Sequence, residues 1–389
     1  MTPKSDAYRT LLISKIPAER RGREYVTNSL WSRDINTNIR TVSDISLICP
    51  VQKVSDTEAQ PLDPRIKVSD SNHLTLDQLE TLIRQTDVVE IPGNFHWLGA
   101  KLSRQAARLA KRHGKISVLG ISSNRAKTTI MNTAGRGFPT RIRAWIRAAS
   151  IRLSQIYLAR NCDGVRVVGE GLRPLVEKHA KDLHIGVASW IQDADFHDLN
   201  KPKTELVSVV IASRLEPMKG VHIGIEAVAK ALTEGGNIEL KVIGEGREEQ
   251  RLRDLIQERE MSETTHFLGT LSYPEPFFDT LRQSNFVLLT NLNDEQPRLI
   301  FDAISQGAIP ICPRNRAYEA LGIDARVLYT QGVATSLCDT IQKLCAASAS
   351  EMADLQEQLT AFAKSRTLDT MHQHRRDWVL SLLLKKTVH

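Results

Sequence analysis

Short apolar segments alternate with amphipathic segments along the chain, and this alternation limits the fold more than any other feature. In the first half, the segments typical of strands are 10–16, 45–49, 87–91, 116–121 and 164–168. The segments typical of helices are 25–34, 74–86, 100–113, 140–160 and 171–181. Because strands that alternate with helices form parallel sheets covered on both faces, we expect an α/β protein.

The alternation starts afresh after a polar segment, 199–205, which we interpret as a linker. Strands are then predicted at 207–212, 238–243, 265–268, 286–290 and 309–312, with helices at 221–233, 248–259 and 274–283. A chain of 389 residues exceeds one ordinary core. We expect two doubly wound, Rossmann-like domains, 1–199 and 200–365. The segment 366–389 is predicted to form a C-terminal helix that packs back on the body.

Two segments are expected to be loops. Residues 60–72 are polar and contain prolines, and residues 122–137 show no period and are interpreted as a mobile loop. In the first strand-to-helix connection, Gly22 marks the expected turn after 10–16.

Composition and cysteine spacing narrow the class of protein. Hydrophobic residues make up 41% and charged residues 25%, which is typical of globular proteins. No apolar run is long enough to span a bilayer, and the first residues lack the pattern of a signal peptide. The five cysteines are scattered and contain no CxxC pair, so neither a metal site nor a disulfide framework is indicated. We therefore expect a cytoplasmic protein without a bound metal or other cofactor.

The net charge of +7 is concentrated in one span. Residues 1–200 hold 30 Lys and Arg against 20 Asp and Glu, and the remainder holds 22 against 25. Lys101–Arg160 alone has fourteen basic residues and no acid. Its predicted helix 140–160 carries an apolar stripe, with Trp145 on or near it. The stripe consists of Ile142, Ile146, Ala149, Leu153 and Ile156.

Three interpretations of the basic span remain open. The first is a solvated face, the second is a surface that binds an anionic membrane or acceptor, and the third is a surface that binds nucleic acid. The chain has no recognised nucleic-acid motif and little aromatic interleaving, which disfavours nucleic acid. Attachment to the inner face of a membrane stays open as a hypothesis beside the solvated face.

The segment Asn291–Pro313 is the first candidate site. Pro297 suits the first position of a short helix and Gly307 the residue just past its end. Asp294, with Glu295 beside it, lies at the start of that helix, and Asp302 is expected on its outer face with Arg298 and Gln306. A helix N-terminus suits a phosphate, and carboxylates accept hydrogen bonds from sugar hydroxyls. The combination indicates a ligand with a diphosphate and sugars.

Two further motifs follow predicted strands. The segment SRLEPMKG, 213–220, places Arg214 and Lys219 where both can neutralise one diphosphate. The segment VIGEG, 242–246, places Gly244 where a backbone can approach closely. Taken singly, each has a plain alternative: solvated charges, an ordinary turn, or a surface ion pair between Arg298 and Asp302 worth about 0.2–0.5 kcal/mol.

In order and spacing, the three motifs resemble those of glycosyltransferase family 4, retaining enzymes of the GT-B fold classed among glycosyl transferases group 1. That family has a G-R-L…K-G turn, a strand ending in G-x-G, and an E-G-F-x…E-A-x-A-x-G-x-P-V segment, read here as DEQPRLIFDAISQGAIPI. HFLGTL, 266–271, resembles the segment beside the nucleobase. The resemblance covers 206–325, and is looser before that, where Gly22 stands at the family's glycine-rich loop.

The resemblance implies two domains facing a central cleft and transfer of a sugar from a nucleotide diphosphate sugar to a hydroxyl, with retention. It implies that Arg214 and Lys219 hold the diphosphate, that Asp294 lies near the donor sugar, and that Asp302 lies on the ribose. The other donor-binding positions that it implies are Gly22, Gly244, Glu245, Phe267, Leu268, Gln296, Arg298 and Leu299. The acceptor would be a glycan, a lipid-linked glycan or a small molecule.

This sequence departs from the family pattern at three places. Both family glutamates are aspartates, the Gly-aromatic pair after the first is Glu295-Gln296, and no His follows 116–121. Asn124 and Arg125 are the candidates left on the acceptor side. A donor-binding protein without transferase activity and a sugar-nucleotide epimerase on the same fold therefore stay open as alternatives.

Overall fold

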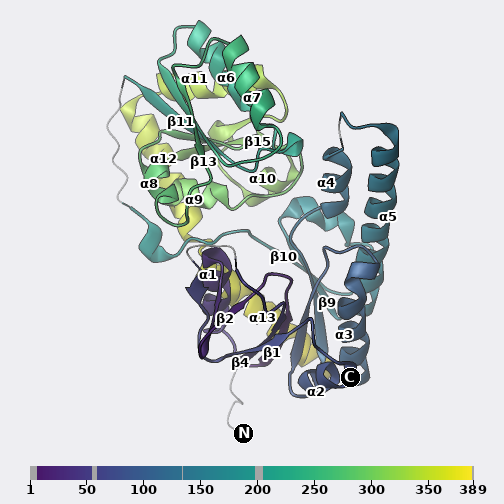
Figure 1. Ribbon diagram of the computed structural model, residues 1–389. Helices are drawn as coiled ribbons and strands as arrows, with labels where there is room; N and C mark the ends of the chain where they lie inside the picture. The colour runs from purple at the N-terminus through teal and green to yellow at the C-terminus, as the bar shows by residue number, and fades with distance from the viewer. Residues whose placement is uncertain (1–6, 55–58, 134, 198–204, 388–389) are drawn as a thin grey trace. The chain divides into compact units, whose positions relative to one another are not determined.

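The computed structural model describes residues 7–54, 59–133, 135–197 and 205–387, and they form two compact units (Figure 1). The first unit comprises Met1–Ile130, Arg136–Val187 and Leu368–His389. The second comprises Ala188–Thr367, with Met131–Gly135 grouped with it. The units divide after Val187, where the sequence suggested 199. Residues 198–204 of the predicted linker lie outside the described residues.

The first unit is built on a parallel sheet. Its strands are β1 (Arg9–Ile13), β4 (Asp44–Cys49), β6 (Ile66–Asp70), β7 (Val88–Pro92), β8 (Ile116–Ile121), β9 (Gly164–Val168) and β10 (Leu183–Gly186). Among the described residues these seven strands lie in the order β10-β9-β8-β7-β1-β4-β6. A small antiparallel sheet consists of β2 (Glu19–Arg21), β3 (Glu24–Thr27) and β5 (Gln60–Pro61).

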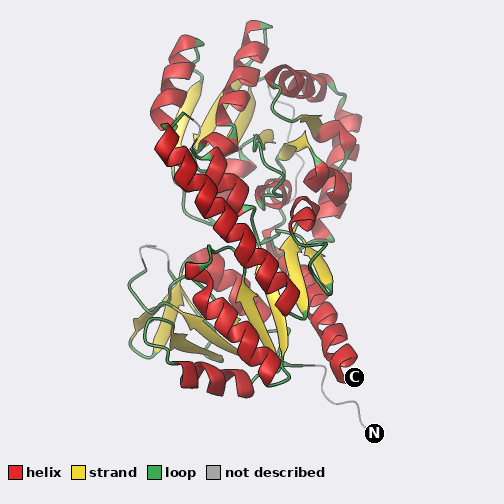
Figure 2. Ribbon diagram, turned by 90° about the vertical axis from the view of Figure 1, so that its right-hand side faces the viewer, coloured by secondary structure: helices red, strands yellow, loops and turns green. Residues whose placement is uncertain are grey.

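Helices cover both faces of this sheet (Figure 2). They are α1 (Ser29–Asn38), α2 (Leu76–Arg84), α3 (Lys101–Arg112), α4 (Arg125–Met131), α5 (Phe138–Asn161) and α13 (Leu368–Thr387), with 3-10 turns η1 (Leu98–Ala100) and η2 (Glu170–Leu175). Leu79, Ala106 and Leu158 bring α2, α3 and α5 onto one face. Ile35 and Val379 bring α1 and α13 onto the other.

The C-terminal helix α13 returns to the first unit and is held there by polar and apolar contacts. The Trp378 indole packs on β9, where a Cβ on Gly164 would lie 2.7 Å from the Trp378 ring. Its Nε1–H donates to the Asp182 carboxylate at 2.8 Å. Arg375 forms an ion pair with Glu90 of β7, and both side chains are buried. Such a pair is costly to break, because the remaining charge stays buried without its partner.

The second unit also contains a parallel sheet. Its strands are β11 (Val207–Ala212), β12 (Ile238–Ile243), β13 (Thr265–Gly269), β14 (Phe286–Leu288), β15 (Ile309–Arg314) and β16 (Leu328–Thr330), and within the described chain they lie in the order β13-β12-β11-β14-β15-β16. The helices are α6 (Val221–Thr233), α7 (Glu249–Glu258), α8 (Phe277–Arg282), α9 (Leu299–Ser305), α10 (Arg316–Leu321), α11 (Ala334–Ala346) and α12 (Ala349–Lys364). The 3-10 turns are η3 (Asp193–Asp195), η4 (Pro217–Lys219) and η5 (Ala325–Val327).

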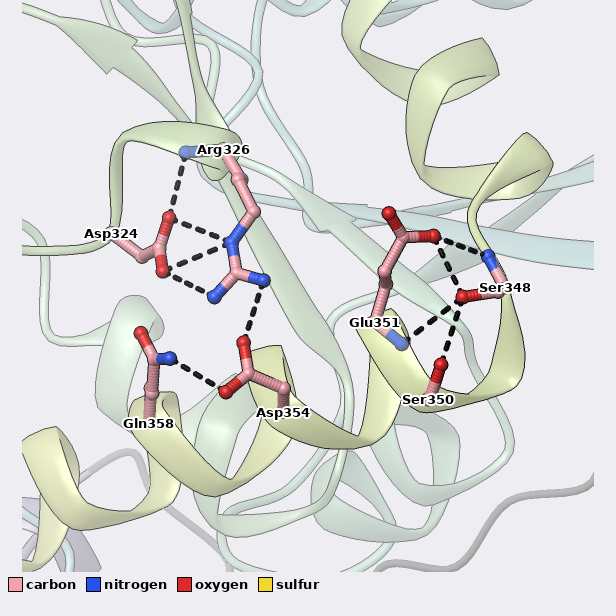
Figure 3. A network of polar contacts seen from close by, with 7 residues as sticks. All are labelled: Asp324, Arg326, Ser348, Ser350, Glu351, Asp354 and Gln358. Atoms are coloured by element: carbon pink, nitrogen blue, oxygen red, sulfur yellow. Dashed lines mark hydrogen bonds and ion pairs between the residues drawn. The ribbon is translucent and has the colours of Figure 1, made fainter.

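Polar and aromatic contacts hold helix α12 on this unit. Figure 3 shows Arg326 of η5 between the carboxylates of Asp324 and Asp354, with Nη1 to Asp354 Oδ2 at 2.9 Å. Nearby, Ser348 and Glu351 form the capping box that starts the helix. On the inner side, the Phe362 ring stacks on Phe301 of α9 with centroids 5.7 Å apart. Helix α12 therefore covers α9, the helix that follows the candidate acidic loop.

Several expected elements differ from the structure. Residues 25–27 belong to β3, so the predicted helix 25–34 begins only at Ser29. The predicted loop 60–72 contains β5 and β6, and β6 pairs in parallel with β4 through hydrogen bonds that its polar side chains do not reveal. The predicted loop 122–137 contains α4. The predicted helix 171–181 is only the turn η2, which contains Pro174, a residue without an N–H to donate.

Helix α5 exists as predicted, but its apolar stripe faces solvent. Ile142, Trp145, Ile146 and Leu153 are all exposed, whereas the face toward the unit consists largely of small residues. Alanine and serine permit the close approach of α4 and α3 to α5, so they form the packed face in place of the larger residues. In the part of the chain that the structure describes, no helix combines the length and apolarity needed to cross a bilayer.

The buried Glu90–Arg375 pair generates a stability prediction. Glu90→Ala leaves the Arg375 guanidinium buried without its carboxylate, and we expect it to lower the free energy of unfolding by roughly 3–5 kcal/mol. Arg65→Ala, which breaks an exposed pair with Asp63, should cost much less, because water screens that pair. Urea unfolding followed by circular dichroism measures both. Equal losses in the two variants would contradict the assignment.

Candidate functional site

The three sequence motifs meet at the carboxyl ends of neighbouring strands. SRLEPMKG follows β11, VIGEG ends β12, and the acidic loop follows β14. Because β11 lies between β12 and β14, the turn Arg214–Lys219 lies beside the segment that begins at Asn291, as predicted. Ligands of doubly wound sheets bind at this edge, so the edge is the candidate site.

The G-x-G motif lets the first two loops touch. Gly244 has φ +120°, and a Cβ there would lie 2.0 Å from the Ser213 carbonyl oxygen. A Cβ on Gly246 would lie 2.4 Å from the Leu215 oxygen. The Leu215 N–H donates to the Glu245 carbonyl at 2.9 Å, which closes the contact. The glycines are therefore needed for the packing of the loops, whatever ligand they meet.

Gly220 joins the first loop to the acidic loop. Its φ is +62°, and a Cβ would lie 2.3 Å from the Thr290 carbonyl oxygen. The Thr290 hydroxyl donates to the Lys219 carbonyl at 2.7 Å, and the Leu292 N–H donates to the Met218 carbonyl at 2.9 Å. The backbone of Lys219 is consequently fixed against the start of the third motif.

The environment of Lys219 perturbs its charge. Burial lowers the pKa of its ammonium below the ordinary 10.5, the nearby Arg214 acts in the same direction, and the Glu295 carboxylate opposes both. Arg214 itself is exposed. A half-buried cation beside an exposed one is an arrangement that an anion with two charges can neutralise.

The acidic loop is shaped by amide side chains. The Asn291 Nδ2 donates to the carbonyls of Asn293 at 2.9 Å and Glu295 at 3.3 Å, and its Oδ1 accepts from the Tyr318 hydroxyl at 3.1 Å. Gln331 donates to the carbonyls of Asn291 and Asn293 at 2.9 and 3.2 Å. The backbone that carries Asp294 and Glu295 is therefore held by hydrogen bonds to these side chains. Tyr318 and Gln331 were not identified from the sequence, because they approach this loop from later elements.

Gln296 has a structural task that its sequence position did not reveal. The side chain is buried, its Oε1 accepts from the Ala188 N–H at 2.9 Å, and its Nε2 donates to the Ala188 carbonyl at 3.1 Å. These two bonds fasten the segment that enters the second unit. The predicted donor contact of Gln296 is thus left to its backbone.

Helix α9 is buried throughout, which corrects the expected outer face. The Asp302 side chain is 1% exposed, and Gln306 is buried with its Nε2 donating to the Asp195 carbonyl at 2.7 Å. The reason is that the segment 188–197 contacts Arg298 and Gln306 on the side expected to meet solvent, while α12 packs on Phe301. The helix begins after Arg298, so Pro297 precedes it, and Gly307 with φ +75° ends it as predicted.

Arg298 lies between two aromatic rings. Its guanidinium is 4.6 Å from the Tyr273 ring centroid and 5.3 Å from that of Trp190. Its Nε is 3.8 Å from the Asp302 Oδ2, so the partner of the expected surface ion pair is in fact buried. Trp190 and Tyr273 were not identified from sequence, because a cation–π contact between distant segments leaves no local pattern.

The remaining predicted residues divide between the units. Phe267 on β13 lies 4.1 Å under the Arg253 guanidinium, and Leu268 is exposed. Gly22, with φ +65°, turns between β2 and β3 in the first unit. Asn124 there accepts from the Lys127 N–H at 3.1 Å, and Arg125 beside it, the first residue of α4, is exposed. Among the described residues, no group of three or more His, Cys, Asp or Glu is placed to hold a metal ion.

The close approach at Gly220 can be tested with a matched glycine. Gly220→Ala and Gly322→Ala share the cost of a left-handed backbone, about 1 kcal/mol, but only Gly220 faces a carbonyl oxygen. We expect Gly220→Ala to lower the melting temperature more than Gly322→Ala and to displace Lys219. Differential scanning fluorimetry compares the two melting temperatures. A decrease for Gly220→Ala that is no larger than the one for Gly322→Ala would contradict the close approach of Gly220 to the Thr290 carbonyl oxygen.

The family Glycosyl transferases group 1 matches residues 191–366. No curated protein matches the chain. Among solved structures, HepE of Anabaena in complex with UDP has a TM-score of 0.68 at 15% identity, covering 96% of this chain and 99% of that one. A glycosyltransferase of Rickettsia africae has a TM-score of 0.67 at 11% identity, with 97% and 99% covered.

A sucrose-phosphate synthase of Thermosynechococcus elongatus is also similar, with a TM-score of 0.60 at 14% identity and 97% of each chain covered. These likenesses extend over both units, so they include the first half, where the sequence pattern was loose. The chain therefore has the two-domain GT-B fold, and its residues 191–366 match glycosyl transferases group 1.

Proposed function

We propose that this protein is a retaining glycosyltransferase that moves a sugar from a nucleotide diphosphate sugar to a hydroxyl acceptor. The observation that carries the proposal is the cationic pair Arg214 and Lys219, fixed beside an acidic loop at the carboxyl edge of a parallel sheet. The family match supports it, as do the structures of HepE with UDP and with UDP-glucose.

In this proposal the second unit binds the donor. Arg214 and Lys219 neutralise the diphosphate, which gains negative charge as its bond to the anomeric carbon breaks. Burial of Lys219 strengthens its attraction for that charge, because the screening by water is weaker there. The acceptor oxygen forms the new bond to the anomeric carbon as the bond to the diphosphate breaks, and its proton passes to the departing diphosphate.

The two aspartates take different positions. Asp294 is partly exposed on the acidic loop, which suits contact with the donor sugar. Asp302 is buried beneath Arg298, so it meets the ribose only when the Arg298 side chain moves aside or shares the carboxylate. The amides near Arg298, together with Gly244, Glu245, Leu299, Phe267 and Leu268, complete the proposed donor contacts. Gly22 is kept as a proposed donor-binding position, and Asn124 and Arg125 are proposed for the acceptor.

The acceptor is proposed as a glycan, a lipid-linked glycan or a small molecule, and the reaction is proposed to need no metal. We place the enzyme in the cytoplasm, because its five cysteines are free thiols and four of them are buried.

A donor-binding protein without transfer activity is the second candidate, and the burial of Asp302 favours it. The two are separated by incubating the protein with UDP-, GDP- and ADP-sugars and measuring nucleoside diphosphate release with and without glycan or lipid acceptors. Acceptor-dependent release supports a transferase. Thermal stabilisation by a donor without release supports a binding protein, and sugar conversion without an acceptor supports an epimerase.

Replacing either cation should abolish most activity. For Lys219→Ala and Arg214→Ala, we expect kcat/KM to fall roughly 100-fold or more, because the leaving diphosphate loses a positive partner. Lys343→Ala removes an exposed lysine of α11 and should leave the rate unchanged. Initial rates of diphosphate release provide the comparison. A full rate in either site variant would show that the mechanism is wrong.

The lowered pKa of Lys219 predicts an alkaline limit. The protonated ammonium binds the diphosphate, so donor affinity should fall as the pH rises through a pKa below 10.5. Lys219→Arg keeps its charge throughout this range, so its kcat/KM, although lower, should lose that decline. The profile of kcat/KM against pH tests this. An identical alkaline decline in the arginine variant would assign it to another group.

A further inference from the structure

Helix α5 exposes large apolar side chains along one face. Phe138, Trp145, Ile146 and Leu153 are 75%, 60%, 66% and 62% exposed, and Ile142 is also exposed. Their spacing of three, four, seven or eight residues places them on one side of a helix. Isolated apolar residues at a surface need no explanation, but a row of five on one helix indicates an interaction surface.

The opposite side of α5 is the packed one. Ala144, Ala148 and Ile151 face the unit, where Ala126 of α4 contacts them, and α3 packs against the same helix. In Figure 1, α3 and α4 lie on one side of α5. The exposed row is therefore a second apolar face in addition to the one that stabilises the fold.

A neighbouring loop enlarges the apolar face. The Trp97 N–H donates to the Ser150 hydroxyl at 3.0 Å, and the Trp97 ring meets the Tyr157 ring edge-to-face with centroids 5.3 Å apart. Leu98, the next residue, is 79% exposed. Two tryptophans thus stand at this surface, a residue type favoured where water meets lipid.

Basic residues border the apolar row on both sides. At 100° per residue, Arg141 and Arg143 flank the row that runs through Ile142 and Trp145, and all four are exposed. Across the whole span Lys101–Arg160 there is no acidic residue that would offset these charges. The face is therefore apolar at its centre and positive at its margins.

We propose that the exposed face of α5, with the Trp97–Leu98 loop, docks on an anionic lipid bilayer, the apolar row entering the headgroup region and the arginines meeting lipid phosphates. Charge complementarity selects this occupant, because a second copy of the chain would bring the same positive margins into contact. Each basic residue near such a surface contributes about a fivefold change in binding. This proposal does not depend on the transferase assignment.

Co-sedimentation of the full chain with vesicles tests the proposal. We expect binding to vesicles rich in phosphatidylglycerol, weak binding to pure phosphatidylcholine, and release at high salt. Trp145→Ser with Leu153→Ser should abolish most binding by removing the apolar contact. Arg141→Gln with Arg143→Gln should weaken it about twenty-five-fold by removing two charges.

Matched controls separate docking from general effects. Leu384→Ser removes an apolar side chain that is 69% exposed on α13, and Arg40→Gln with Lys53→Gln removes two exposed charges from the same unit. Both controls should bind like the original chain, and all variants should keep its melting temperature because the changes are at the surface. Equal sedimentation with neutral and anionic vesicles, or unchanged binding by both α5 variants, would overturn the proposal.

A dimer in size-exclusion chromatography that Trp145→Ser with Leu153→Ser dissolves, without vesicle binding by the original chain, would instead assign the face to a second copy. Loss of vesicle binding leaves donor binding untouched, so failure of this proposal and failure of the transferase proposal are distinguishable.

Discussion

The candidate site depends on the close approach of three loop backbones, which leaves no space for a Cβ where they meet. At Gly220, Gly244 and Gly246 a single added carbon would overlap a carbonyl oxygen of the neighbouring loop. Three strand-end loops can therefore cross within hydrogen-bonding distance, and the crossing fixes Lys219 relative to the acidic loop. The positions of the charges follow from these contacts, because no single loop would hold Lys219 beside the acidic loop.

The sequence predicted most of what period and spacing control. The βα alternation, the glycine at the end of α9 and the adjacency of the motifs all follow from local patterns and from the geometry of parallel strands. The strand β6, with the sequence IKVSD, was missed because its stability comes from pairing with β4 and not from apolar side chains. The burial of α9, Asp302 included, was missed because α12 and the segment 188–197, which contact this helix, are distant in sequence.

Helix α5 shows a limit of a different kind. Periodicity identified its row of large apolar residues correctly but could not tell which side of the helix the unit would cover. The unit covers the side with alanine, because close helix packing gains more from small side chains at the contact than from bulky ones beside it. Periodicity alone therefore does not tell which of the two apolar sides of α5 packs into the unit.

The return of α13 to the first unit affects the order in which the chain folds during its synthesis. Trp378 and Val379 cover a face of the first sheet, yet they leave the ribosome only after all of the second unit. During synthesis, the core cluster that contains Ile35, Ile45 and Leu47 therefore stays incompletely covered. It is completed only after the second α/β unit has emerged and α13 has followed. The first unit to be translated is thus the last to be completed, and part of its apolar face stays exposed until α13 has been made.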